Sequence, residues 1–157
     1  MAGYFLKIDG IAGESQDPRH PGEIELESFG WGESHLASAP GTSATGRPHI
    51  RDFQVTKRID KASPLLMLAA ASGQHFKTAV LTAQHPGPEP QGYLTFTFTD
   101  LMVSSYQIEA PDGQPWPADQ VSFSFGRIEM AYRPQRPDGT LDAPVTAGWD
   151  VTANREM

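Results

Sequence analysis

The residues that most often bind metals or transfer protons are scattered along this sequence. Its five histidines are His20, His35, His49, His75 and His85. None lies in an HExxH motif or four residues from another histidine, so a zinc site has no local scaffold. A long loop could bring His35, His49 and Asp52 together, but unpaired loop histidines are more often ordinary polar surface residues. We therefore expect no bound metal.

Candidate nucleophiles and paired acids also lack the surroundings that catalysis needs. The Ser-Ser-Tyr run at 104–106 has no Gly-x-Ser-x-Gly motif, the turn that exposes a catalytic serine. Residues 23, 25 and 27 are glutamates and could suggest a glycoside hydrolase. Strict alternation places all three on one side of a strand, however, which is typical of a solvated face. Asp60 beside Lys57 and Lys61 indicates local ion pairing ahead of a helix. We expect neither enzymatic activity nor a cofactor.

Length, charge and cysteine content narrow the class of protein further. The 157 residues fit a single domain, 1–157. A formal net charge of -7 with scattered basic residues argues against nucleic-acid binding, because phosphate contacts need clustered Lys and Arg. The absence of cysteine excludes disulfides and thiolate chemistry. Without a signal-peptide pattern or an apolar run long enough to span a membrane, we expect a protein made in the cytoplasm that leaves it, if at all, without a cleaved signal.

The elements that must position any site are mostly strands. The 15 glycines and 14 prolines separate segments with alternating polarity, a pattern typical of all-β domains with many turns. In the last long strand the apolar positions change from odd to even at Gly126, which predicts a β-bulge there. A short turn is expected at Asp100. The predicted strands cover residues 4–9, 23–27, 53–59, 76–83, 93–99, 101–108 and 121–132.

One segment predicts a helix. Ser63 suits the N-cap, Pro64 the first helical position and Gly73 the stop; the residues between them are apolar nearly all round, so the helix should pack against the sheets. Residues 32–50 form an unpatterned stretch, expected to be a functional or mobile loop, and residues 134–147 are rich in turn formers. The fold class expected is mainly β: a β-sandwich or partly closed β-barrel with one short α-helix packed on it.

Several motifs along the chain resemble those of one known family. Their order and spacing matter more than any one of them. They are FLKIDGI at 5–11, SFGWG at 28–32, IDKASP at 59–64, KTAVL at 77–81, VSSY at 103–106 and GWD at 148–150. Together they resemble the haemolysin-coregulated protein family (Hcp), the tube subunits of bacterial type VI secretion systems. The stretches at 33–50 and 134–147 resemble the family least.

The resemblance implies a function in assembly and export. Members of the family form hexameric rings with a wide lumen, and the rings stack into a tube. The tube lies inside a contractile sheath, beneath a spike tip, and is expelled into a target cell. Some members hold small effector proteins in the lumen. The partners implied for this chain are therefore copies of itself, spike-tip and sheath proteins, and effectors.

A ring subunit needs surfaces that face other proteins, and the sequence offers two candidates. The first is Phe29 and Trp31, two aromatics on a strand face that earlier carried glutamates. They are covered either by the chain's own loop or helix or by a neighbouring subunit. The second is a hydroxyl face that could contact another strand, line a wet channel or be ordinary solvated surface. Its residues are Thr95, Thr97, Thr99, Ser122 and Ser124.

Two other functions stay open at this point. The chain could be a carbohydrate-binding β-sandwich module or a small hydrolase. A sugar-binding module would expose a planar strip of aromatics, and Trp31, Trp116 and Trp149, although far apart in sequence, could converge into one. Glycan binding with and without these residues separates that reading from tube assembly, and sustained turnover of a substrate would favour the hydrolase.

Overall fold

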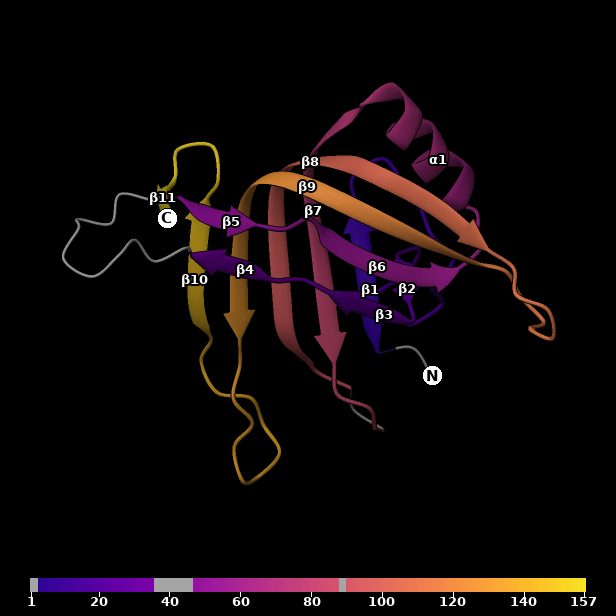
Figure 1. Cartoon of the computed structure of the whole chain (residues 1–157). Coiled ribbons are helices and arrows are strands. Elements are labelled where there is room, and N and C mark those ends of the chain that lie inside the picture. The colour runs from indigo at the N-terminus through magenta and orange to yellow at the C-terminus, as the bar shows by residue number, and fades with distance from the viewer. Residues whose placement is uncertain (1–2, 36–46, 88–89) are drawn as a thin grey trace.

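The computed structural model describes residues 3–35, 47–87 and 90–157. Over these residues the chain forms mainly β-structure with one short helix, as predicted (Figure 1). The elements are β1 (Tyr4–Ile8), β2 (Ile24–Leu26), β3 (Ser28–Gly30), β4 (Glu33–His35), β5 (Pro48–Ile50), β6 (Phe53–Arg58), α1 (Ser63–Ser72), β7 (His75–Gln84), β8 (Gly92–Glu109), β9 (Ala118–Tyr132), β10 (Val145–Asp150) and β11 (Arg155–Glu156).

The main sheet is antiparallel and curls back on itself. In the described part of the chain its strand order is β11-β10-β9-β8-β7-β1-β2, while β6 pairs with β9 and β3 pairs with β6. The turn from β2 to β3 brings the β2 end of this path next to β6, where the Glu27 N–H donates to the Thr56 carbonyl at 2.8 Å. The result is a partly closed barrel, in line with the expected fold class (Figure 1).

An aromatic cluster fills the barrel. Phe53 on β6 is 1% exposed, and its ring centroid lies 5.0 Å from that of Phe98 and 5.2 Å from that of Phe96. Phe125 packs on Phe98 at 5.3 Å. These side chains sit at alternate positions of their strands, so the pleat turns them to one face. Offset and edge-to-face contacts of this kind stabilise a core beyond the apolar area they bury.

Along each of the two longest strands, β8 and β9, the residues that face inward change between even and odd numbers about halfway, which we call the exchange of faces. Phe98 lies opposite Ile128, and Leu101 lies opposite Phe125; all four are buried. At this point the next inward-facing residue on each strand comes three positions later and not two, from Phe98 to Leu101 and from Phe125 to Ile128. The inward positions of both strands therefore change between even and odd numbers at the same place. Asp100 has a φ of 58° there, a left-handed conformation that is uncommon for a non-glycine residue.

This arrangement corrects two predictions. Gly126 is not a bulge, because Thr99 pairs with Arg127 and Leu101 with Phe125 without a register shift. Asp100 is not a turn either, since β8 continues through it. The irregularity in the ladder lies between Val103 and Ser105. In the sequence of one strand, a change of the apolar positions from odd to even suggests the extra residue of a β-bulge. The paired strand makes the same change here, so no extra residue is needed.

Helix α1 begins differently from the prediction. Its N-cap is Ala62, without a side-chain hydrogen bond, and Ser63 is already helical. The Ser63 hydroxyl instead donates to Asp119 Oδ2 at 2.7 Å, so the predicted N-cap was wrong. The end was predicted correctly: Gly73 adopts the left-handed conformation at φ 70°, and its N–H donates to the Ala69 carbonyl at 3.0 Å.

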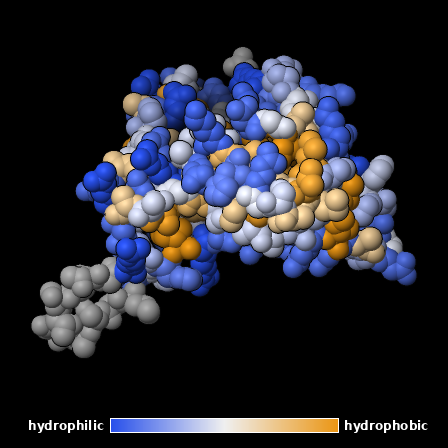
Figure 2. Space-filling view, turned by 90° about the horizontal axis from the view of Figure 1, so that it is seen from above, coloured by the Kyte–Doolittle hydropathy of each residue, from blue (hydrophilic) through white to orange (hydrophobic). Residues whose placement is uncertain are grey.

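Only one face of α1 packs on the barrel. Leu66 and Ala69 are buried, and the helix packs mainly against β8. On the other face Leu65 is 44% exposed and Met67 and Leu68 are each 56% exposed. The prediction that an apolar helix packs against the sheet therefore holds for one face, and the subunit leaves the other face uncovered. Figure 2 views the molecule from above, the end at which α1 lies in Figure 1, and shows apolar patches between polar surroundings.

The two stretches expected to be irregular contain strands. Within 32–50, β4 pairs with β5 in a two-stranded sheet, with Ser34 opposite His49; residues 36–46 lie outside the described part. Within 134–147 a bridge joins Gln135 and Leu141, and β10 begins at Val145. The prediction of an unpatterned loop was wrong at its two ends. All three residues of β4 are exposed, so no polarity alternation marks it in the sequence.

Candidate assembly surfaces

Phe29 and Trp31 turn toward the barrel of their own chain. The Phe29 ring lies 5.0 Å from Tyr4 and 5.8 Å from Phe53, and Trp31 contacts Phe53 and Phe125. The change of face that the sequence shows occurs between β2 and β3, where Leu26 is buried and the next inward residue is Phe29. Both aromatics are half-buried, so each keeps part of its surface available to another molecule.

Trp31 also joins the two ends of the β4–β5 arm. Its Nε1–H donates to the Arg51 carbonyl at 2.8 Å, and the Arg51 N–H donates to the Gly32 carbonyl at 3.2 Å. These two bonds tie the chain entering β4 to the chain leaving β5. An indole that packs on the core and anchors an arm in this way positions the arm relative to the barrel.

The predicted hydroxyl face is divided into two parts. Thr95 and Thr97 lie opposite Ala131 and Glu129 of β9 and are half-buried. Ser122 and Ser124 lie beyond the exchange of faces, where Ser122 is 8% exposed and Ser124 is half-buried. Strand alternation turns both pairs away from the aromatic core, but they occupy opposite halves of the β8–β9 pair. They do not form one patch.

A buried ionic cluster lies beneath α1. Lys57 and Asp119 are each 0% exposed, and Lys57 Nζ lies 3.0 Å from Asp119 Oδ2 and 2.8 Å from Asp60 Oδ1. Lys57 Nζ also donates to the Ser63 hydroxyl at 2.8 Å, and the Tyr106 hydroxyl donates to Asp119 Oδ2 at 2.7 Å. Burial, followed by the bond to Asp119, raises the pKa of Tyr106 to about 12.

The cluster links β6, β8, β9 and the start of α1. Sequence reasoning identified the local part of it, Asp60 beside Lys57, but missed Asp119 because 62 residues separate Asp119 from Lys57. A signal was available: Asp119 begins a segment in which the odd positions Val121, Phe123 and Phe125 face the core. An acidic residue in phase with core positions indicates a buried carboxylate that needs a partner.

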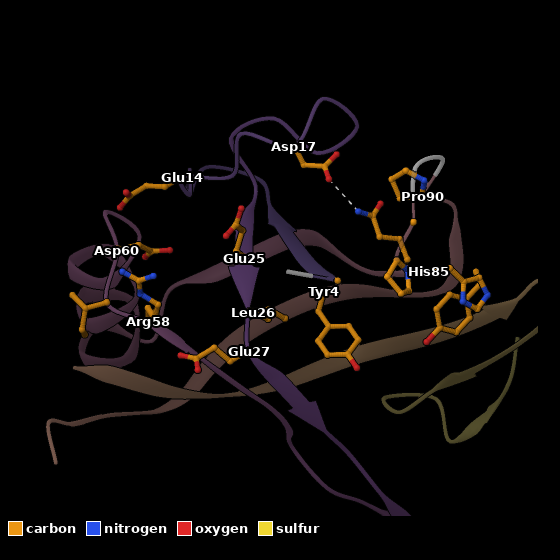
Figure 3. A pocket seen from close by; sticks show the side chains of 16 residues that line it. Tyr4, Glu14, Asp17, Glu25, Leu26, Glu27, Arg58, Asp60, His85 and Pro90 are labelled. Atoms are coloured by element: carbon orange, nitrogen blue, oxygen red, sulfur yellow. Dashed lines mark hydrogen bonds between the residues drawn. The ribbon is translucent and has the colours of Figure 1, made fainter. Parts of the chain in front are cut away.

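A second charged feature is an open hollow outside the barrel, about 1030 Å³ in volume. It lies over β1, β2 and the ends of β6 and β7 (Figure 3). Glu25 and Glu27, two of the alternating glutamates, line it. The third, Glu23, has its Oε1 atom 3.1 Å from His20 Nδ1. Figure 3 shows carboxylates from several segments around the hollow, with His85 on its far wall.

The remaining candidates for chemistry do not gather. His75 pairs with Asp100 at 2.9 Å in an exposed position, and Asp52 accepts a hydrogen bond from the Ser104 hydroxyl at 2.6 Å. Over the described ranges no group of three His, Asp or Glu side chains could hold a metal ion. Trp31 and Trp149 line one hollow, whereas Trp116 lies under the Arg58 guanidinium, so the three tryptophans form no single strip.

Comparison with known proteins identifies the family. The sequence model described as "Type VI secretion system effector, Hcp" matches residues 5–132, from the first strand to the end of β9. The chain belongs to the Hcp family. Hcp proteins are structural, secreted proteins of the type VI secretion system, so the chain is a type VI tube or secreted protein of this kind.

Relatives cover nearly the whole chain. The protein hcp1 of Pseudomonas aeruginosa is 36% identical over 154 residues, which is 96% of this chain and 95% of the relative. A solved structure described as a type six secretion system protein is 30% identical, with full coverage of both chains and a TM-score of 0.92. Hcp1 from Salmonella typhimurium is 35% identical, also with full coverage, and has a TM-score of 0.78.

No helix in the described ranges is long and apolar enough to cross a membrane. The main surface features of the described residues are an uncovered apolar helix face, a tethered β4–β5 arm and an acidic hollow.

Proposed function

We propose that this Hcp protein works by self-assembly, forming hexameric rings that stack into an exported tube. The observation that carries the proposal is the family match across 5–132 together with relatives that cover nearly the whole chain. Assembly is then the activity, and the protein has no enzymatic function or cofactor. The resemblance to tube subunits further supports loading of small effectors in the lumen and contacts with sheath and spike-tip proteins.

The uncovered face of α1 supports contact with another copy. The helix sequence, residues 63–72, contains no charged residue, and Leu65, Met67 and Leu68 are 44–56% exposed. Monomeric proteins seldom expose a cluster of large apolar side chains without a partner. A closed ring of identical subunits buries such a face against a different surface of the next subunit.

The predicted site residues have separate places in this proposal. Phe29 and Trp31 contribute their exposed edges to a subunit contact next to the β4–β5 arm, which Trp31 anchors. Thr95 and Thr97 face away from the core on β8, and Ser124 does so on β9, whereas Ser122 is buried within the subunit and is not part of this surface. Uncharged hydroxyls suit a surface that lines a channel or meets another strand closely. Such a lining passes proteins of different charge without strong attraction.

Export follows from the same proposal. The subunit is made in the cytoplasm and leaves through the type VI machine as part of the tube. The experiment that tests the proposal is native mass spectrometry of the purified chain at micromolar concentration, with negative-stain imaging of the same sample. We expect a mass of six subunits and ring-shaped particles. A monomer at every concentration contradicts the proposal.

A further inference from the structure

A second hollow, about 700 Å³ in volume, lies between the β4–β5 arm and the β10 end of the main sheet; we call it the arm groove. Its floor is made by Ala147 and Trp149 of β10. They lie opposite Met130 and Ile128 of β9, which also line it. The arm forms the other wall with residues 33–35. Most of the residues that line the arm groove are apolar, so it suits an apolar partner surface.

The core of the barrel does not extend into the arm groove. Ile128 is 5% exposed, whereas Met130, two residues farther along the same face of β9, is 44% exposed. Ala147, opposite Met130, is exposed as well. The inward face of the sheet thus continues past the barrel with apolar side chains that the described chain leaves partly uncovered, and a partner that covers them is favoured. The hydrogen bond from Trp31 to the Arg51 carbonyl holds the arm in place, so the groove exists before a partner binds.

On the other side of the barrel, α1 presents an apolar ridge. Leu65 and Leu68 are three residues apart, so they are neighbours on the helix surface, and they are 44% and 56% exposed. Lys61, four residues before Leu65, continues this row beyond the start of the helix. Figure 1 shows α1 on one side of the barrel and β4, β5 and β10, which bound the arm groove, on the other. The chain therefore carries a convex and a concave apolar surface that do not meet within one molecule.

The charges beside the two surfaces are complementary. Among the described residues that line the arm groove, Glu33 is the one carboxylate, and none is a lysine or an arginine. Helix α1 contains no charged residue, and Lys61 closely precedes it. The side chains of Glu33 and Lys61 are both exposed, and neither has an ion-pair partner in the described part of the chain. Opposite charges at the edges of two apolar surfaces favour one orientation of docking over its reverse.

We infer that the ridge of α1, Leu65 and Leu68, docks in the arm groove of a second copy of this chain, with Lys61 beside Glu33 of that copy. The inference rests on the proposed ring and names the two surfaces that meet in it. A ring with cyclic symmetry needs two different surfaces on every subunit, because each subunit contacts one neighbour with each surface. A contact between two α1 helices would instead close after two subunits.

Cross-linking of the full-length chain tests which surfaces meet. The chain has no cysteine, so the introduced thiols are the only ones that react. We expect Leu68→Cys/Ala147→Cys, treated with a short bis-maleimide, to give covalent species of up to six subunits on denaturing gels, while each single variant stays monomeric. Leu65→Cys replaces Leu68→Cys if the first double variant does not fold. Covalent dimers of Leu68→Cys alone would indicate a contact between two α1 helices and would overturn the inference.

Native mass spectrometry of the same samples separates this inference from the ring itself. If the double-cysteine variant forms hexamers and yet gives no covalent species above the monomer, the ring stands and the assignment of its surfaces is wrong. If the parent chain is a monomer at every concentration, the proposed ring fails and the inference fails with it.

Two neighbouring residues of β10 provide a matched pair of variants. Ala147→Glu places a charge in the arm groove and is expected to raise the protein concentration at half-assembly at least about tenfold. Thr146 is also exposed, but it points to the other face of the strand and does not line the groove. We therefore expect Thr146→Glu to assemble like the parent. Equal assembly of the two glutamate variants, measured by analytical ultracentrifugation, contradicts the inference.

Exchanging the two charges tests the orientation of docking. Lys61→Glu and Glu33→Lys each bring like charges together, and each is expected to weaken assembly about threefold. The double exchange, Lys61→Glu/Glu33→Lys, restores an opposite pair and should assemble like the parent. A double variant that assembles no better than either single variant would show that Lys61 and Glu33 do not meet.

Discussion

Lys57 and Asp119 form a fully buried ion pair, with Nζ 3.0 Å from Oδ2 and neither side chain exposed. The pair holds β6 against the start of β9, and Ser63 and Tyr106 extend it to α1 and β8. The charges do not add simply to stability, because each loses its water on burial. What the pair does fix is the position of the helix start relative to three strands.

Removing one partner of this pair should destabilise the protein strongly. We expect Asp119→Leu to lower the free energy of unfolding by about 3–5 kcal/mol, because it leaves the buried Lys57 ammonium with Asp60 as its one remaining carboxylate partner among the described residues and removes the acceptor of the Ser63 and Tyr106 hydroxyls. The double variant Lys57→Met/Asp119→Leu should recover a large part of that loss. Urea unfolding of the parent, Lys57→Met, Asp119→Leu and the double variant measures the coupling free energy between the two side chains. Lys61→Met, at an exposed lysine nearby, is the control; a double variant no more stable than Asp119→Leu would contradict the account.

Tyr106 should make stability fall at alkaline pH. Its pKa is raised from 10.0 to about 12 in the folded protein, so between these values the unfolded chain loses its phenolic proton while the folded chain keeps it. Stability due to this group is complete below pH 10 and is lost as pH rises toward 12. We expect Tyr106→Phe to show a shallower decline in melting temperature over this range than the parent. Parallel curves would show that Tyr106 does not titrate differently on unfolding.

Gly126 should not tolerate a large acidic side chain. A Cβ at this position would lie 3.3 Å from Asp100 Cβ and 3.5 Å from Asp100 Oδ2, so Gly126→Glu both crowds and repels Asp100. We expect a loss of about 1–3 kcal/mol in unfolding free energy and a smaller loss for Gly126→Ala. Gly30→Glu is the matched control, since nothing lies within 4 Å of a Cβ there. Equal stability of the two glutamate variants would refute the argument.

The exposed face of α1 should be needed for assembly and not for folding. Leu68 is 56% exposed, so Leu68→Glu leaves the core untouched and places a charge in the proposed subunit contact. We expect the protein concentration at half-assembly to rise at least about tenfold, while the melting temperature of the monomer is unchanged. Ala71→Glu, also exposed and on the same helix, is the control. Analytical ultracentrifugation gives the assembly curves, and unaltered assembly of Leu68→Glu removes α1 from the contact.

Signals from neighbouring residues in the sequence predicted where helices and strands form better than they predicted which residues those elements contact. Pro64 and Gly73 located α1 because backbone geometry at helix ends depends on neighbouring residues alone. Ser63 was misassigned as the N-cap because its hydroxyl bonds to Asp119, 56 residues away, and a long-range partner of this kind leaves no local trace. The mainly β fold was predicted correctly from the alternating polarity along the strands, because a curled sheet keeps this alternation.

The surfaces were harder to predict than the core. Phe29 and Trp31 were identified as unusual from their change of face, yet the sequence could not show that their rings reach Phe53 on a strand paired with β3. The hollow was missed altogether, because Glu14, Glu25 and Asp60 come from separate segments and each looks like an ordinary solvated acid. Only the register of β1 with β2 and the path of the loop before β2 place them together.

The exchange of faces on β8 and β9 determines how this protein can be modified. On β8, odd-numbered residues point outward up to Thr99, and even-numbered residues do so from Asp100 to Met102, before the register shift near Ser104. Cysteines introduced on the outer face for dyes or cross-links must therefore be placed at odd-numbered positions up to Thr99 and at even-numbered positions just after it. A labelling scan that assumed one parity throughout would assign the residues from Asp100 to Met102 to the wrong side of the strand.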